Sequence, residues 1–323
     1  MIRSLLIRET ACVDPYENLA LEQALLESIR PGECILYLWQ NENTVVIGKN
    51  QNPWKECKTS LLQQEGGKLA RRLSGGGAVF HDLGNLNFTF LMAQEDYCLD
   101  KQLNVIQTAL ADLKIPCQRS GRNDIVADGR KFSGNAFYKN GKQACHHGTL
   151  LVNADMDKLG RYLSPSKAKL QAKGVGSVRS RVVNLREFRP DLTMEMLKTA
   201  LISAFSKVYG LEAAAMPSAS PDPGRISFLA ERNRSWEWNF GQKLPFTLEC
   251  EDRFPWGGLQ IQLQIEGGII RSAKVFTDAM DWSLAPSLEA LLPGCPFCRD
   301  ALLRQLGTDG PAGDLFSLLE RCL

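Results

Sequence analysis

The sequence predicts an α+β protein with a large N-terminal domain and a small C-terminal one. In the first third of the chain, helices with clear start and stop signals alternate with short apolar strands. Residues 121–152 carry the turn punctuation of a β-meander. After Leu244-Pro245, three strand-like segments precede a run of helical segments. We therefore expect one domain over residues 1–244 and a second over residues 246–323.

The helix and strand signals are strongest at turns and caps. Asp14 suits a helix N-cap, Pro15 the first helical position, and Glu17 the third position of a capping box. Asp128-Gly129 and Asn140-Gly141 are favoured hairpin turns. The expected strands are 34–40, 44–48, 68–73, 86–92, 124–127, 130–138, 142–152, 246–251, 259–265 and 269–276, and the expected helices include 53–65, 99–113 and 193–209.

The composition is that of a globular protein. The 323 residues are 44% hydrophobic, and the net charge of +2 is too small to indicate nucleic-acid binding. No apolar run is long enough to cross a bilayer, and the first nine residues alternate like a strand and meet charge too early for a signal peptide. Ten scattered cysteines without an export signal predict reduced thiols and a cytoplasmic location.

A glycine-rich stretch follows two arginines. Arg71-Arg72 lead into Ser74 and then into Gly75-Gly76-Gly77. Consecutive glycines allow tight bends and close approach of the backbone to a ligand. With guanidinium groups just before them, phosphate or carboxylate is the expected ligand. The glycines alone are equally compatible with a simple hairpin turn. No Gly-Lys-Ser/Thr follows, so this is not a P-loop.

Lys131 is the strongest single candidate for chemistry. It lies on an expected strand between Gly129 and Ser133, and small neighbours leave room for a ligand. Most strand lysines are simply solvated. Beside a glycine loop, however, a lysine cation offsets the charge of a carboxylate and a phosphate that must meet.

The other candidates are weaker. His146 and His147 are adjacent on a strand, so only one of them can face a site. His81 is as compatible with a structural role as with ligand binding. Cys295 and Cys298 have the spacing of a thiol pair but lack a second pair for zinc. The sequence contains no metalloprotease motif, nucleophile elbow or Rossmann fingerprint.

Residues 158–189 form a basic segment. A solvated face is the ordinary explanation for such a run, but its one-sided charge and embedded glycines favour a loop that meets an anionic ligand or partner. Against the single acid Glu187, the segment holds Lys158, Arg161, Lys167, Lys169, Lys173, Arg179, Arg181, Arg186 and Arg189.

These motifs together resemble the lipoate–protein ligase A family. Residues 71–85 resemble its glycine-rich signature, and residues 121–124, 130–136 and 146–151 resemble its second and third blocks. Residues 173–185 are similar to its basic loop. The resemblance extends to residues 45–57 and 235–241. After about Leu291 the sequence contains no recognisable motif of the family.

The resemblance implies a biotin/lipoate ligase catalytic fold: a mixed sheet packed by helices, with a small C-terminal domain. It also implies a two-step reaction. Lipoate or octanoate reacts with MgATP to give an acyl-AMP, and a lysine of an acceptor lipoyl domain then accepts the acyl group. The implied acceptors are acidic lipoyl domains of 2-oxoacid dehydrogenase E2 subunits and the glycine cleavage H protein. We expect a monomer that binds neither nucleic acid nor membrane.

The resemblance also assigns site residues, motif by motif. Lys131 is the expected catalytic residue, and no metal ligand is assigned. The expected ATP-binding residues are Arg72, Gly77, Ala78, Val79, Phe80, Asn123, Asp124 and Lys131; those for lipoate are Arg72, Ser74, Gly76, Lys131 and His147; those of the loop over the adenylate or acceptor are Lys173, Gly174 and Arg179.

Three other functions remain open on the sequence. A cysteine-dependent octanoyl or lipoyl transferase shares this fold, and Cys145 is the only cysteine near the motifs. A transferase that uses preformed lipoyl-AMP is a second alternative. A non-catalytic lipoate or biotin sensor is a third, although an intact Lys131 speaks against it.

Overall fold

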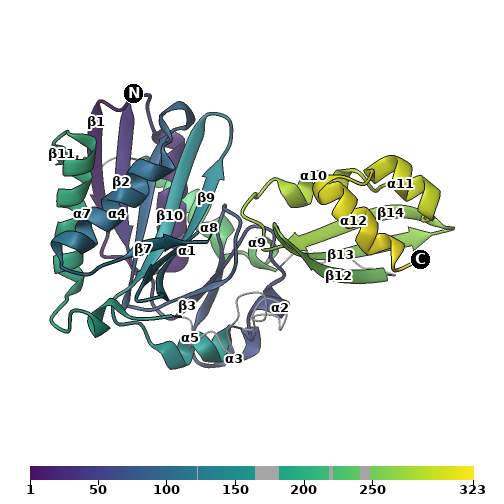
Figure 1. Cartoon of the computed structure of the whole chain (residues 1–323), viewed down its shortest axis with the longest axis horizontal. Helices are drawn as coiled ribbons and strands as arrows, with labels where there is room; N and C mark the ends of the chain where they lie inside the picture. The colour runs from purple at the N-terminus through teal and green to yellow at the C-terminus, as the bar shows by residue number, and fades with distance from the viewer. Residues whose placement is uncertain (122, 164–181, 218–220, 241–247) are drawn as a thin grey trace.

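A mixed eight-stranded sheet forms the centre of the N-terminal domain (Figure 1). The computed structural model describes residues 1–121, 123–163, 182–217, 221–240 and 248–323. The strands β11, β1 and β2 are parallel, and the remaining neighbours that are paired run antiparallel. In sheet order, the strands are β11 (Ala213–Ala215), β1 (Ser4–Glu9), β2 (Glu33–Trp39), β6 (Asn85–Ala93), β10 (Gln143–Leu151), β9 (Arg130–Lys139), β8 (Asp124–Ala127) and β7 (Gln118–Ser120).

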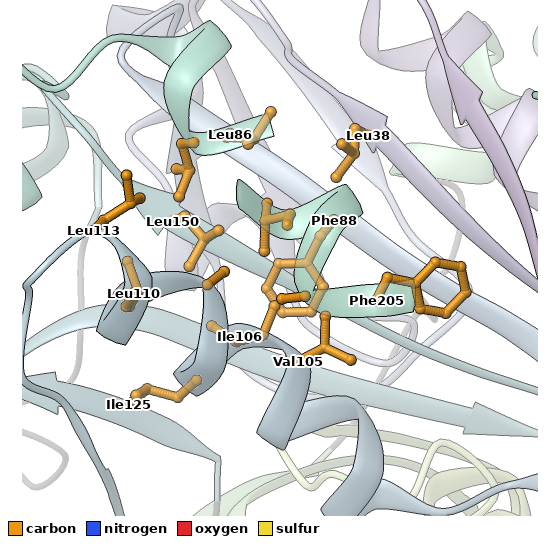
Figure 2. Close-up of a cluster of buried hydrophobic side chains, with 14 of the residues drawn as sticks. Leu38, Leu86, Phe88, Val105, Ile106, Leu110, Leu113, Ile125, Leu150 and Phe205 are labelled. Carbon is orange, nitrogen blue, oxygen red and sulfur yellow. The ribbon is translucent and has the colours of Figure 1, made fainter. Parts of the chain in front are cut away.

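Helices cover both faces of this sheet because the central strands are apolar on both sides. Leu36 and Leu38 of β2 face one side, where Phe88 packs with residues of α4 and α7 (Figure 2). Tyr37 and Trp39 face the other side and pack with α1 residues. The helix α8 packs on α1. These helices are α1 (Pro15–Ser28), α4 (Leu99–Asp112), α7 (Met194–Tyr209) and α8 (Pro223–Arg234).

A smaller sheet carries the glycine-rich loop. Its strand order is β4-β3-β5, and Val45, Phe80 and Tyr162 lie in its core. The loop runs from β4 into β5, so it lies within this small sheet and does not lead directly into the 86–92 strand that we expected to follow it. The elements here are β3 (Thr44–Ile47), α2 (Pro53–Glu56), α3 (Thr59–Gln64), β4 (Lys68–Arg71), β5 (Val79–His81), α5 (Met156–Tyr162) and α9 (Trp236–Asn239).

The C-terminal residues build a separate hydrophobic core. Three helices pack on one face of an antiparallel sheet (Figure 1). The expected boundary at Leu244-Pro245 lies outside the described residues. The elements are β12 (Leu248–Phe254), β13 (Gly257–Glu266), β14 (Ile269–Thr277), α10 (Leu284–Ala290), α11 (Arg299–Leu306) and α12 (Gly310–Glu320).

Local signals placed most elements correctly. The Asp14 side chain accepts hydrogen bonds from the backbone N–H groups of Tyr16 and Glu17, as an N-cap does. The Glu17 carboxylate binds Arg234 of α8, so the expected capping box is replaced by a contact between helices. The single helix expected after Asn52-Pro53 is two helices, α2 and α3.

One expectation about the cysteines is wrong. Cys250 and Cys322 form a disulfide, with Cα atoms 7.1 Å apart, whereas the other eight cysteines are free. The bond ties β12 to the end of α12. Sequence reasoning missed it because the two residues are separated by 72 positions and meet only in the folded C-terminal domain. Among the described residues, no helix is both long and apolar enough to cross a membrane.

Two buried histidines predict acid sensitivity. Burial lowers the pKa of His81 and His146 to about 3, whereas an unfolded histidine has a pKa of about 6.5. Between these values the unfolded state binds more protons, so the free energy of unfolding falls as pH falls. Each histidine contributes up to about 1.4 kcal/mol per pH unit. Urea unfolding at pH 7 and 5 should show this loss, and His146→Gln should make it shallower. An unchanged slope would contradict the account.

Candidate functional site

A cavity of about 140 Å³ lies where the glycine loop meets β9 and β10. Gly76, Gly77, Ala78 and Val79 line it, and so does Lys131. The two features singled out in the sequence, about 55 positions apart along the chain, thus share one cavity.

The Lys131 ammonium group is held inside this cavity. Its Nζ lies 2.7 Å from Oδ1 of Asp124, and both side chains are largely buried. A β-carbon at Gly134 would come within 2.7 Å of the Lys131 Nζ. The glycine therefore leaves space that any larger residue would take from the ammonium group. Asn123, which also lines the cavity, is fixed by hydrogen bonds with Asn135.

The two arginines before the loop stabilise the protein rather than reach outward. The Arg71 guanidinium donates to five backbone carbonyl groups, including those of Gly48 and Asn239. The Arg72 guanidinium donates to the carbonyls of Gly75 and Gly77 and so shapes the loop. Burial lowers the pKa of Arg72 to about 10, so it stays charged at neutral pH. Arg72 lines the cavity and at the same time holds the loop through these hydrogen bonds; we call it the loop clamp.

A buried hydrogen-bond chain joins this clamp to α1. The Nε of Arg72 lies 3.0 Å from the Ser74 hydroxyl, which lies 2.6 Å from Nε2 of His147. The Nδ1 of His147 lies 2.8 Å from the Glu22 carboxylate. Burial raises the pKa of Glu22, but the contacts with His147 and Thr89 outweigh burial and hold this pKa below its ordinary value, so the carboxylate is ionised. Glu22 was not predicted from sequence, because an acid in an amphipathic helix ordinarily faces water.

Replacing Glu22 should loosen this chain. We expect Glu22→Gln to lower the free energy of unfolding by about 3 kcal/mol, because it removes the charged acceptor of two buried hydrogen bonds, with Thr89 and His147. Glu27→Gln is the matched control on the same helix, since Glu27 forms an exposed pair with Arg225, and it should cost under about 1 kcal/mol. Equal losses in the two variants would contradict a special role for Glu22.

Of the other predicted residues, some line the cavity and others do not. His147 faces the cavity, whereas His146 is buried on the opposite face between Gln102 and Asn135, as adjacency on a strand requires. Ser74 lies behind the loop. Phe80 packs in the core of the small sheet and does not belong to the described lining of the cavity. Lys173, Gly174 and Arg179 lie outside the described residues.

The cavity is also lined by residues that the sequence did not assign to the site. Leu19, Trp39 and Val46 supply apolar wall. Nε2 of His81 and Nδ2 of Asn87 are buried there without a hydrogen-bond partner among the described residues. The C-terminal domain contributes Arg253, Asp278 and Met280. Within the described ranges, no group of three or more His, Cys, Asp or Glu side chains could hold a metal ion.

The architecture defines the class of protein first. A mixed sheet covered by helices, followed by a small α+β domain, is a biotin/lipoate ligase-like catalytic fold. Residues 14–206 match the lipoyl protein ligase A/B catalytic domain, and residues 243–309 match the bacterial lipoate protein ligase C-terminus. The chain belongs to the lipoyl protein ligase A/B catalytic domain family. The resemblance read from the sequence is thereby confirmed.

Solved structures agree with this assignment. P. falciparum LipL1, in complex with lipoate, is 28% identical with a TM-score of 0.83, over 97% of this chain and 98% of that chain. A bipartite lipoate protein ligase from Thermoplasma acidophilum, described with its E2 lipoyl domain, is 26% identical with a TM-score of 0.63, over 77% and 100%. A lipoate-protein ligase A bound with ATP is 26% identical with a TM-score of 0.62, over 75% and 99%.

Proposed function

We propose that this enzyme is an ATP-dependent lipoate–protein ligase that works through an acyl-adenylate. The observation that carries the proposal is the shared cavity, which Lys131 and the glycine loop both line. The lipoate-bound and ATP-bound relatives support the two substrates. In the first step, a carboxylate oxygen of lipoate bonds to the α-phosphorus of ATP, and pyrophosphate leaves.

The site can neutralise the negative charges of the two substrates in this step. A carboxylate and a phosphate repel each other until cations lie between them, and we expect Lys131 to contact both. When the substrates bind, their anions would replace Asp124 as the partners of the Lys131 ammonium group. The apolar wall of Leu19, Trp39 and Val46 suits the hydrocarbon arm of lipoate or octanoate. Bound with ATP, Mg²⁺ would supply further neutralisation of the phosphates; Asp124 and Asp278 are the carboxylates in the described lining of the cavity that would hold it.

The second step is amide formation. The ε-amine of an acceptor lysine, with an ordinary pKa of about 10.4, loses a proton and attacks the acyl carbon. The bond from that carbon to the phosphate oxygen breaks, and AMP leaves. We propose lipoyl domains of E2 subunits and the glycine cleavage H protein as acceptors, a partner class supported by the E2 lipoyl domain of the archaeal system. A monomer in the cytoplasm remains our prediction.

Lipoate-dependent exchange between ATP and pyrophosphate tests the proposal. The ligase should show exchange that requires lipoate or octanoate, followed by transfer to a purified lipoyl domain. A transferase that uses a preformed adenylate should transfer without exchange. A binding protein should do neither, so absence of exchange in the wild-type enzyme would reject the proposal.

The cysteine-dependent alternative is disfavoured by the position of Cys145. Its thiol is buried, and burial raises its pKa well above the ordinary value. A protonated, buried thiol is a poor nucleophile. All ten cysteines lie in described ranges, and the described lining of the cavity includes none of them.

The basic segment should contribute to acceptor binding. Reversing the charges of Lys167 and Lys169 to Glu should raise the KM for an acidic lipoyl domain several-fold at low salt, because electrostatic steering is lost. Exchange, which needs no acceptor, should change little. If the KM and its salt dependence stay at wild-type values, the segment has no such role.

A further inference from the structure

The C-terminal domain supplies part of the cavity wall, and the contact is specific. The backbone N–H of Gly76 donates to the carbonyl of Ala279 at 2.8 Å. On each side of Ala279, Asp278 and Met280 line the cavity. The short segment between β14 and α10 therefore holds the glycine loop and borders the site at the same time.

Arg253 of β12 is the cation that this domain brings to the cavity. Its side chain is mostly buried, with 19% of its surface exposed. The Nη1 atom lies 3.5 Å from Oδ2 of Asp278, at the limit of a hydrogen bond. Among the described residues, its Nε and Nη2 groups have no hydrogen-bond partner. The guanidinium fork therefore retains donors that a phosphate fits.

Asp278 positions this arginine but contacts only its Nη1 atom. The other carboxylate oxygen of Asp278 accepts the backbone N–H of Gly258 at 2.7 Å. This bond fixes the carboxylate at the start of β13. The pair thus presents the arginine from a rigid sheet, which is how a preorganised binding group is best held.

A second cavity shows where a bound polyphosphate would end. Arg253 and Asp278 line both this cavity and the first one, so they stand at the boundary between them. Beyond that boundary the wall carries the carboxylates Glu56, Glu251 and Asp252. Lys55 also lines this second cavity, but its ammonium group is paired with Glu249 and Glu251. The acids repel phosphate and hold Lys55, so Arg253 is the cation at the boundary that a polyphosphate extending from the glycine loop would meet.

We propose that Arg253 binds the β- and γ-phosphates of ATP during adenylation, as a residue that the C-terminal domain contributes to the nucleotide site. This inference rests on the proposed ligase function. As the carboxylate oxygen bonds to the α-phosphorus, the bond from that phosphorus to the bridging oxygen breaks, and pyrophosphate leaves with the electron pair. Arg253 stabilises the charge that gathers on pyrophosphate. The second step involves no pyrophosphate and does not need Arg253.

The two half-reactions test this assignment. We expect Arg253→Gln to lower kcat/KM for ATP in lipoate-dependent exchange about 100-fold, the usual effect of removing one preorganised donor. Transfer from chemically prepared lipoyl-AMP to a lipoyl domain should fall at least 30 times less than exchange. Arg253→Lys should restore part of the exchange, because it keeps the charge but loses the fork. The KM for pyrophosphate in the reverse direction should rise with that for ATP.

Controls separate the possible failures. Arg271→Gln removes an exposed arginine of the same C-terminal sheet, paired only loosely with Glu266 at 3.8 Å, and should leave exchange unchanged. If exchange by Arg253→Gln stays within 2-fold of wild type, or if exchange and transfer fall together, the assignment is wrong. A wild-type enzyme without lipoate-dependent exchange would instead reject the ligase function itself.

Discussion

Lys131→Ala should abolish lipoate-dependent ATP–pyrophosphate exchange, lowering its rate at least about 1000-fold. Loss of one preorganised electrostatic contact in a buried site costs about 3–4 kcal/mol of transition-state stabilisation. Lys131 serves both anions of the reaction, so its removal should reach the upper end of that range or beyond. Exchange of labelled pyrophosphate into ATP measures the effect directly.

Cys145→Ala is the companion variant. It removes a buried thiol that lies on the strand just before the two histidines. The ligase mechanism makes no use of this thiol, so exchange should stay near the wild-type rate. The reverse pattern, with Lys131→Ala active and Cys145→Ala inactive, would favour the cysteine-dependent transferase. Asp124→Asn offers a further comparison, because it keeps the size of the partner of Lys131 and removes its charge.

Gly75→Ala should produce the second-largest loss. A β-carbon at this position would lie 2.3 Å from the carbonyl oxygen of Ala279 and 2.7 Å from that of Met280. Both are backbone atoms, so the loop and the C-terminal segment must move apart. The Gly76–Ala279 hydrogen bond would then break and displace the loop that faces Lys131. Displacements of about 1 Å in a site cost on the order of 100-fold in rate, and we expect exchange to fall by that amount.

Gly160→Ala provides the matched control for this loss. Gly160 lies on α5, and a β-carbon there meets no atom within 4 Å. In a helix interior, alanine is the better residue by about 0.5–1 kcal/mol. The control should therefore keep full exchange and unfold at the same or a higher urea concentration. Normal activity in Gly75→Ala would show that the tight contact between loop and C-terminal segment is unimportant for adenylation.

Residue order alone predicted much of this fold because caps and turns are local. Asp14 caps its helix, and Gly210 ends α7 in the left-handed conformation. Asp128 and Gly129 both have positive φ, as a two-residue hairpin turn requires. The glycine loop and Lys131 were also visible, because three adjacent glycines and a lysine among small residues are unusual in any strand-rich segment.

Only the folded chain brings together residues that are distant in sequence and ordinary in appearance. Glu22 is one more acid on a helix until His147 and the buried sheet enclose it. That the guanidinium of Arg72 holds the loop carbonyls is visible only in the folded chain; its contact with the anionic substrates stays a prediction. Arg253 carries no motif, yet packing of the second domain places it at the cavity. Side-chain partners depend on tertiary contacts, and those contacts leave no periodic trace along the chain.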